Sequence, residues 1–346
     1  MTTRSRPMPT TRTATITTIK AATMPEPAPG MTNASRGLLL GLLGVVIFAA
    51  TGPMTKLAVG SLDAPQLTPW FVTFGRAAVA GGLSLVYLLL QGLAARSQGT
   101  VVLPTGREWR LLGLTALGVV VGFPLFFALA LRVVPSTHGA VVTGLLPLAT
   151  AVVAALWFRQ RPSRSFWGCA LLGTGLVLAF MVLRSADSAG RLSVHMADVF
   201  LLAAMLSAAV GYVSGARLTP SLGAERVICW ALVISLPVTL PMAWANAPLD
   251  ASSIHRSSWW AFGYVALFSM WLGFFAWYRG LAVGGAVLVS QTQLVQPFLS
   301  LLIAVPLLGE PLDGVTLGFG AAVIASVFVS KKLAVNAAPA VPLKPL

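Results

Sequence analysis

Long runs of apolar residues, separated by short polar segments, dominate this chain. A membrane-spanning helix needs about 20 mostly apolar residues, and ten runs meet or approach that length. They lie at approximately 37–60, 67–91, 110–131, 134–158, 165–183, 197–216, 226–246, 259–279, 284–308 and 314–334. The connections between them are often too short to form a domain. The pattern predicts an all-α integral membrane protein with ten transmembrane helices.

The two ends of the chain lack such apolar runs. Residues 1–35 are rich in Thr, Pro and Arg and contain one acid, Glu26, so we expect a disordered basic N-terminal tail. The same composition also fits a transit peptide, and Met24 or Met31 would serve as an alternative start of translation. Residues 335–346 are expected to form a short C-terminal tail.

Composition agrees with a membrane location. Hydrophobic residues make up 57% of the 346 positions and charged residues 9%, against about 45 to 50% and about 25% in soluble proteins. None of the nine carboxylates falls in the middle of a long apolar run. A soluble core could not hide so much apolar surface, so the soluble classes are excluded.

The placement of the basic residues predicts an orientation. A formal charge of +14 could indicate nucleic-acid binding, but the Lys and Arg residues lie between apolar runs and at the ends of the chain. Basic residues near span ends are retained in the cytoplasm. With both termini inside, seventeen Lys and Arg residues lie on the inner side and four on the outer side. We expect a multi-pass protein of the cytoplasmic (inner) membrane with cytoplasmic termini, surrounded by lipid and without a nucleic-acid partner.

An internal repeat divides the apolar runs into two groups of five. Sliding the chain by 150 positions superposes Trp109 on Trp259, Gly113 on Gly263, Leu131 on Leu281, Pro147 on Pro297 and Gly168 on Gly318. We predict one five-helix repeat at 36–184 and a second at 195–334. Because five is odd, the second repeat enters the membrane from the opposite side. Such inverted repeats are common in secondary transporters, whose substrate sites lie near the midplane between the repeats.

The chain resembles the drug/metabolite transporter superfamily, in its EamA-type family of ten-helix carriers. The resemblance rests on the Pro-containing runs at 143–157 and 293–308, the Leu-Gly-Glu-Pro segment at 308–311, Arg76, and the aromatic run that ends at 277–281. The first repeat departs from the family, because Phe158-Arg159-Gln160-Arg161 replaces a Gly-Glu-Arg-like turn. The resemblance implies membrane transport. It does not identify the solute, because members of the superfamily carry very different solutes.

Polar residues concentrate in the ninth apolar run. Ser290, Gln293, Pro297 and Ser300 follow helical spacing, with Gln296 beside them, so these groups can face a cavity together. Pro297 has no N–H and frees the carbonyl near Gln293. The 150-residue offset places Thr143, Pro147 and Thr150 at the corresponding positions of the fourth run. We predict a substrate site between these two broken helices. The alternative is that the polar groups only join helices, at about 0.6 kcal/mol each.

Aromatic residues form two stripes. Trp271, Phe275 and Tyr278 share a face of the eighth run, and Phe123, Phe126 and Phe127 form a similar stripe in the third. Aromatic faces suit aromatic or amphipathic solutes, so the first stripe is a candidate part of the substrate site. Contact with lipid, or an aromatic belt at the interface, is the alternative.

Lys56 and Arg76 are the basic residues that fall within apolar runs. Charges there are costly, and they often serve function. Both could attract a substrate carboxylate, as an amino acid would supply. Lys56 could instead snorkel to the interface, and Arg76 could pair with Asp63 or with helix-end carbonyls.

A group for proton coupling is harder to find, since no carboxylate or histidine lies at midspan. Glu310, in the turn after the ninth run, is the nearest candidate. The alternative, which we favour on sequence, is an uncoupled facilitator or exchanger.

Few residues suggest metal or cofactor chemistry. Cys169 and Cys229 lie in apolar runs, and His138, His195 and His255 are far apart and lack metal-ligand spacing. We interpret the histidines as loop or helix-end residues and expect neither a metal nor a cofactor.

The expected function is therefore not enzymatic. We predict efflux or exchange of a small organic metabolite, such as an amino acid, by alternating access. A membrane-embedded transferase acting on a lipid-like substrate is the alternative, which would require a cluster of acids, histidines or metal ligands at a membrane face. Glycines four apart, such as Gly37 and Gly41, or Gly118 and Gly122, either let helices approach one another or build a homodimer interface.

Overall fold

All regular elements in the described part of the chain are helices. The computed structural model describes residues 32–96, 103–157, 164–185, 196–284 and 289–335, so the predicted tails lie almost entirely outside it. The first half contains α1 (Asn33–Ala49), α2 (Thr51–Val59), α3 (Pro69–Arg96), α4 (Gly106–Thr115), η1 (Ala116–Gly122), α5 (Phe123–Leu131), α6 (Ser136–Thr143), α7 (Leu146–Trp157) and α8 (Arg164–Ser185).

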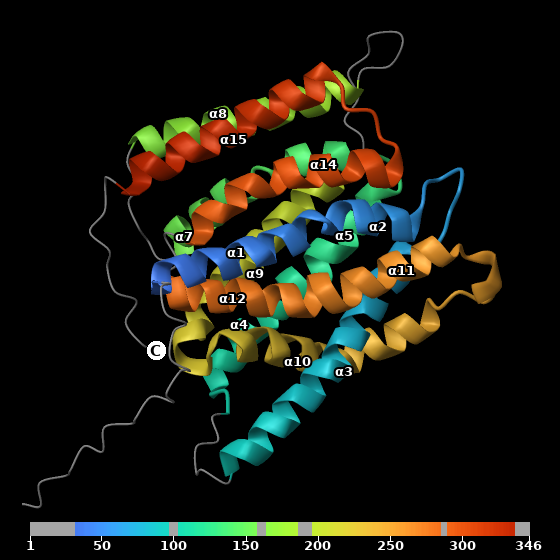
Figure 1. The fold of residues 1–346 in the computed structure, drawn as a ribbon, viewed down its shortest axis with the longest axis vertical. Coiled ribbons are helices and arrows are strands. Elements are labelled where there is room, and N and C mark those ends of the chain that lie inside the picture. The colour runs from blue at the N-terminus through green and yellow to red at the C-terminus, as the bar shows by residue number, and fades with distance from the viewer. Residues whose placement is uncertain (1–31, 97–102, 158–163, 186–195, 285–288, 336–346) are drawn as a thin grey trace, which may run out of the picture. The chain divides into compact units, whose positions relative to one another are not determined.

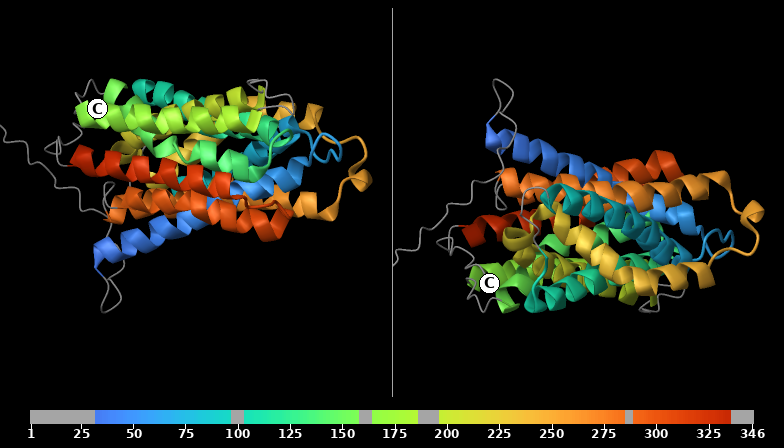
Figure 2. Two further views of the ribbon diagram at one scale, coloured as in Figure 1. Left: turned by 90° about the horizontal axis from the view of Figure 1, so that it is seen from above. Right: turned by 90° about the horizontal axis from the view of Figure 1, so that it is seen from below.

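The second half opens on one continuous helix, and from its third membrane segment onward it follows the order of the first half. It contains α9 (Met196–Leu222), α10 (Ala224–Ala245), the short 3₁₀ helix η2 (Ala251–Ser253), α11 (Arg256–Tyr264), η3 (Val265–Leu272), α12 (Gly273–Gly284), η4 (Ser290–Val295), α14 (Gln296–Leu308) and α15 (Gly314–Val335). In Figures 1 and 2 the helices run lengthwise alongside one another.

Several of these segments are long and apolar enough to cross a membrane. Within the described residues there are seven: Ser35–Val59, Pro69–Leu93, Gly106–Leu131, Ser136–Trp157, Met196–Leu222, Ala224–Ala245 and Arg256–Gly280. Three shorter apolar helices, Leu171–Phe180, Gln296–Leu308 and Gly314–Ser326, occupy the remaining predicted spans. The all-helical, multi-pass fold expected from the hydrophobic pattern is confirmed.

The 150-residue offset is visible in the helix boundaries. Helices of the two halves begin 150 positions apart at Gly106 and Arg256, Phe123 and Gly273, Leu146 and Gln296, and Arg164 and Gly314. α8 and α15 also end at the same offset, at Ser185 and Val335. Boundaries that coincide this closely across a low sequence identity support two structural repeats.

A π-helix interrupts the third segment of each repeat. η1 and η3 are both π-helical, and they cover 116–122 and 265–272, which overlap when the offset is applied. A π-helix is rare, and it occurs frequently at functional sites. Each of these two turns contributes a residue to the cavity described below.

Helices pair between the repeats in a symmetric way. α1 packs on α12 as α9 packs on α5, while α3 packs on α10 and α8 on α15; Figure 1 shows the last pair side by side. If the two repeats are exchanged, the contact of α1 with α12 becomes the contact of α9 with α5. The contacts of α3 with α10 and of α8 with α15 map onto themselves. The bundle therefore has an approximate twofold symmetry.

Glycines permit the closest of these contacts. A Cβ atom on Gly280 would lie 2.7 Å from the backbone nitrogen of Gly41 and 3.0 Å from the carbonyl oxygen of Gly37, and one on Gly118 would lie 2.7 Å from the Cα of Gly211. Of the two uses predicted for such glycines, helix approach within one chain is observed at these contacts. The homodimer stays a prediction.

Candidate functional site

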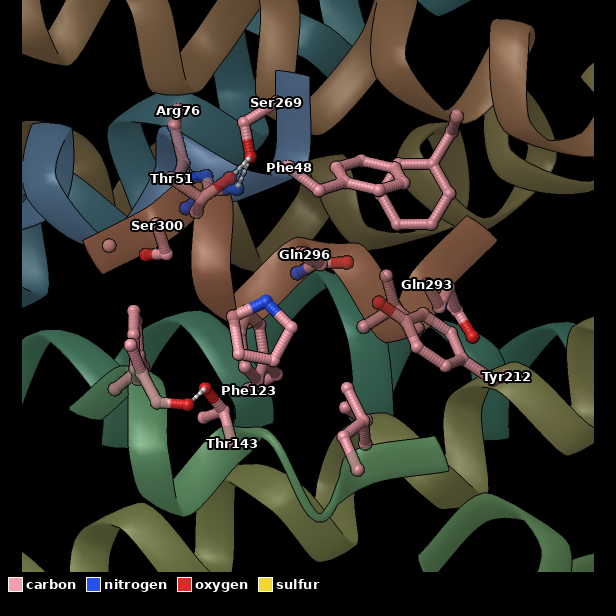
Figure 3. Close-up of a pocket in the computed structure, with 18 residues that line it drawn as sticks. Phe48, Thr51, Arg76, Phe123, Thr143, Tyr212, Ser269, Gln293, Gln296 and Ser300 are labelled. Atoms are coloured by element: carbon pink, nitrogen blue, oxygen red, sulfur yellow. Dashed lines mark hydrogen bonds between the residues drawn. The ribbon is translucent and has the colours of Figure 1, made fainter. Parts of the chain in front are cut away.

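A cavity lies where helices of both repeats meet, beside the broken helices. The space between its walls, including the open mouth, is about 850 Å³. Figure 3 shows the residues around it. It is lined by Phe48, Thr51, Gly52, Arg76, Val119, Phe123, Phe127, Ala140, Thr143, Leu146, Ala208, Tyr212, Ser269, Phe274, Gln293, Gln296, Pro297 and Ser300.

Arg76 of α3 is the one charged residue among the described residues of this lining. Its side chain is 3% exposed, and Nη2 donates a hydrogen bond to Oγ of Ser269 at 3.2 Å. Oγ of Ser269 also lies 2.8 Å from Oγ1 of Thr51. Within the described residues Nε of Arg76 has no hydrogen-bond partner. A buried cation with unused donors is costly unless an anion satisfies them, so Arg76 makes this cavity suitable for an anionic group.

Neutral polar groups come mainly from the second repeat. Gln293 of η4 and Gln296 and Ser300 of α14 line the cavity. The offset relates Gln296 to Leu146 and Ser269 to Val119, which also line it. At these two positions the second repeat is polar where the first is apolar, so the cavity has a polar side and an apolar side.

The apolar side is largely aromatic. Phe123 and Phe127 of α5 stack with centroids 5.2 Å apart, and Phe48 meets Phe274 edge to face at 5.0 Å. Tyr212 of α9 approaches Phe274 at 6.4 Å. Such faces accept an apolar or aromatic group of a solute, while the polar side would bind its charged or hydrogen-bonding end.

Six of the predicted site residues therefore meet at one cavity. They are Arg76, Thr143, Gln293, Gln296, Pro297 and Ser300. Both helices change geometry just before the predicted helix-breaking prolines. α6 ends at Thr143 and α7 begins one residue before Pro147, whereas the 3₁₀ helix η4 gives way to α14 one residue before Pro297.

The other predicted residues of the broken helices contribute less. Thr150 donates its hydroxyl to the carbonyl oxygen of Leu146 at 2.9 Å and does not line the cavity. The side chains of Ser290 and Pro147 lie outside the described part of the structure.

The aromatic stripe of the eighth segment packs away from the cavity. Trp271 lies 5.0 Å from Phe275, which in turn lies 5.2 Å from Tyr87, and Tyr278 is buried in the core at 3% exposure. Ser269 and Phe274 line the cavity instead. The π-helix η3 explains the difference, because its wider turn shifts the register that regular 3.6-residue spacing predicts.

Lys56 of α2 joins two segments of the first repeat. Its Nζ donates to the carbonyl oxygens of Leu131 at 2.6 Å and Val134 at 3.3 Å. Leu131 is the last residue of α5, so the ammonium group satisfies carbonyls at a helix C-terminus, where a cation is favourable. Lys56 does not line the cavity.

Glu310 caps the N-terminus of α6. Its carboxylate accepts hydrogen bonds from the backbone N–H groups of Ser136 at 2.7 Å and Thr137 at 2.8 Å, and from the Ser136 hydroxyl at 3.1 Å. A carboxylate at this place satisfies N–H groups that a helix leaves unpaired. Glu310 of the second repeat therefore holds the broken helix of the first.

We expect Glu310→Ala to destabilise the protein. Removing the cap leaves partly buried N–H groups without an acceptor, which costs about 1–2 kcal/mol and lowers the melting temperature by a few degrees. Thermal unfolding of the purified protein in detergent measures this. Asp250→Ala is the matched control, since Asp250 lies in an exposed turn and bonds Ser252 locally. Equal melting temperatures for the two variants would contradict the capping role.

Sequence reasoning missed several lining residues. Thr51, Ser269 and Tyr212 stand alone as polar residues in apolar runs, a signal that the concentration in the ninth run outweighed. Within the described residues there is no group of three or more His, Cys, Asp or Glu residues that could hold a metal ion.

Both repeats that enclose the cavity match the model of a known protein family. A model described as the EamA-like transporter family matches residues 35–183 and again residues 195–331. The chain belongs to the EamA-like transporter family. The family supports membrane transport as the general function.

Two proteins of similar sequence are also named as transporters. The chain is 40% identical over 304 residues to "Uncharacterized transporter YdeK" of Bacillus subtilis (strain 168), a match that covers 88% of this chain and 100% of that protein. It is 23% identical to "Uncharacterized transporter YyaM" of the same organism, over 76% of this chain and 83% of that protein. A solved crystal structure, described only as that of a protein, aligns with a TM-score of 0.55 at 19% identity, over 87% of this chain and 98% of the other. That likeness indicates a shared fold.

Proposed function

We propose that this protein moves a small amphipathic solute with a carboxylate group, such as an amino acid, across the cytoplasmic membrane by alternating access, in efflux or exchange. The observation that carries the proposal is the buried Arg76, which faces the cavity with an unused Nε. Among the described residues that line the cavity there is no carboxylate. A solute carboxylate would supply the missing acceptor through charge-assisted hydrogen bonds.

The rest of the lining supports an amphipathic solute. Aromatic faces of Phe123, Phe127 and Phe274 lie in the same cavity as the amides of Gln293 and Gln296. The carboxylate would bind Arg76 and Ser269, polar groups next to it would bond the glutamines, and the apolar end would lie against the phenylalanines. A cavity of this kind selects by charge and by shape together.

The proposed membrane arrangement has ten spans in two inverted repeats, with both termini in the cytoplasm. Seven long apolar segments and three shorter ones account for ten spans, and five per repeat gives the halves opposite orientations. Alternating access would then rock one set of helices against the other around the cavity. The glycine contacts between α1 and α12 and between η1 and α9 are suited to such close sliding surfaces.

Counterflow in proteoliposomes tests the proposed function. Vesicles loaded with unlabelled L-phenylalanine, L-leucine or benzoate are diluted into the labelled compound at equal pH on both sides. We expect transient accumulation of label for at least one of these carboxylates, and none for phenethylamine, which has an aromatic ring but no carboxylate. Label no higher than in protein-free vesicles for all three carboxylates would overturn the proposal.

The same experiment separates transport from the alternative of a membrane-embedded transferase. A carrier returns its solute unchanged, whereas a transferase converts it. Chromatography of the label recovered from the vesicles should therefore give the starting compound alone. A new labelled product that forms without vectorial movement would favour the transferase.

A further inference from the structure

The described lining of the cavity carries one unit of positive charge. Arg76 supplies it, at 3% exposure and with Nε unpaired within the described residues. A guanidinium group stays charged at neutral pH. A buried charge is costly until a countercharge and hydrogen bonds compensate it. The net charge of the solute therefore decides how much of this cost binding removes.

The seven described acidic residues lie at helix ends and in loops. Glu108 and Glu225 belong to the first turns of α4 and α10, and Asp63, one predicted partner of Arg76, is exposed in the loop before α3. The other four are Asp198 in the first turn of α9, Asp250 before η2, Glu310 at the cap of α6, and Asp313 before α15. None of these seven lines the cavity. We therefore expect the solute to supply the countercharge for Arg76.

The polar groups that share the cavity with Arg76 are neutral hydroxyls and amides. Oγ of Ser269 accepts a hydrogen bond from Nη2 of Arg76 and lies 2.8 Å from Oγ1 of Thr51. In the view of Figure 3, Gln296 stands between this group and Gln293. An amide can donate to or accept from a neutral hydroxyl of a solute. It supplies no negative charge to balance an ammonium group.

Oxygen acceptors at the broken helices are already in use. Pro297 was expected to free the carbonyl near Gln293, but the carbonyl oxygen of Gln293 accepts the backbone N–H of Gln296 where η4 ends. The Thr143 hydroxyl donates to the carbonyl oxygen of Gly139 at 2.7 Å. An ammonium group in this cavity would have to share acceptors that the helices use themselves, whereas a carboxylate would meet an unused donor on Arg76.

We infer that the site prefers monocarboxylates of net charge −1, whose group next to the carboxylate is neutral, over zwitterionic amino acids. The inference rests on the proposed transport function and narrows its solute class. A monoanion balances the charge of Arg76. A zwitterion leaves that charge in place and brings an ammonium group into the same cavity, where like charges repel strongly because little water screens them.

A 2-hydroxy acid with an aromatic or branched apolar end matches each part of the lining. Its carboxylate binds Arg76, its hydroxyl bonds the amides of Gln293 and Gln296, and its apolar end lies against Phe123 and Phe127. The hydroxyl is neutral and is both a donor and an acceptor, as the amides are. L-phenyllactate is such a compound, and it differs from L-phenylalanine only in carrying a hydroxyl in place of the ammonium group.

Counterflow in proteoliposomes with this matched pair of compounds tests the preference. The half-saturation concentration of each is measured at neutral pH, equal on both sides of the membrane. We expect the value for L-phenyllactate to be lower than that for L-phenylalanine by about 10-fold or more, which corresponds to about 1.4 kcal/mol. Equal values, or a lower value for L-phenylalanine, would overturn the inference.

Gln296→Glu tests the charge argument by placing a carboxylate in the cavity at nearly constant shape. Glutamate balances Arg76 and offers a partner to an ammonium group, so we expect the preference to reverse in favour of L-phenylalanine. Gln66→Glu is the matched control, because Gln66 lies in the loop before α3, does not line the cavity, and accepts the N–H of His255 through an oxygen that glutamate retains. It should keep the preference of the wild type. An unchanged preference in folded Gln296→Glu contradicts the inference, and if this variant does not fold, the wild-type comparison decides.

The outcomes separate this inference from the proposed function. Counterflow of L-phenylalanine without counterflow of L-phenyllactate leaves transport standing and rejects the preference for a monoanion. If no carboxylate gives counterflow, transport itself fails, and the preference is read from thermal unfolding of the purified protein. L-phenyllactate should then raise the melting temperature more than L-phenylalanine does at the same concentration, because the tighter ligand stabilises more. Equal shifts would show that the cavity does not distinguish the two charges.

Discussion

Arg76→Gln is expected to reduce L-phenylalanine counterflow by about 10- to 100-fold. A hydrogen bond to a charged group contributes about 1.5–3 kcal/mol, and each 1.4 kcal/mol corresponds to a factor of ten in affinity. Glutamine retains a hydrogen-bond donor but loses the charge that attracts a carboxylate. The expected signature is a higher half-saturation concentration for the amino acid, with normal insertion and an unchanged elution profile in detergent.

Two comparisons make this result specific to the charge. Arg256→Gln removes an exposed arginine at the start of α11 and should leave counterflow unchanged. Phenethylamine lacks the carboxylate, so its exclusion by the wild type should be relaxed in Arg76→Gln. Counterflow of L-phenylalanine within twofold of the wild type would remove Arg76 from the site.

Gly118→Ala is expected to have the second large effect, on stability. A Cβ at this position would lie 2.7 Å from the Cα and the backbone nitrogen of Gly211 and would also meet the carbonyl oxygen of Ser207. These are backbone atoms of α9, so no side chain can rotate away to relieve the contact. Overpacking of this kind costs about 1–3 kcal/mol. We expect a lower yield of folded protein and a melting temperature several degrees below that of the wild type.

Gly113→Ala is the matched control, since Gly113 lies five residues before Gly118 in the same membrane segment. No heavy atom lies within 4 Å of the Cβ that this substitution would add. Alanine is the better helix former by about 1 kcal/mol, so Gly113→Ala should be neutral or slightly stabilising. If the two alanine variants unfold at the same temperature, the close approach of η1 and α9 is not a constraint on the fold.

The fold was largely predictable because its main determinants are local and repetitive. The length of the apolar runs predicted the helical segments, and the 150-residue offset predicted that α8 corresponds to α15 and α7 to α14. The interruptions were less accessible. Pro147 and Pro297 predict a break in the helix, since proline has no N–H. No residue type predicts the π-helices η1 and η3.

The candidate site was predictable where polar residues interrupt an apolar run. Gln293, Gln296, Ser300, Thr143 and Arg76 carry that signal, and all five line the cavity. Trp271, Phe275 and Tyr278 were placed by ideal helical spacing, and the π-turn before them brings Ser269 and Phe274 to the cavity in their place. Whether any of these residues binds solute stays a prediction.

The pair formed by His138 and Asp198 was beyond the reach of sequence reasoning. Sixty residues separate the two in the sequence, although Nε2 of His138 lies 2.8 Å from Oδ1 of Asp198. Only the packing of α6 on α9 brings them together. Both side chains are buried, at 7% and 2% exposure, which the sequence did not predict.

The matched π-helices also bear on the history of the chain. A wide turn at the same position of both halves, η1 and η3, is most simply inherited from one ancestral five-helix protein whose gene was duplicated and fused. Two identical copies in opposite orientations would enclose a cavity with two equivalent sides. Ser269 and Gln296 in place of Val119 and Leu146 make the two sides of the present cavity unequal.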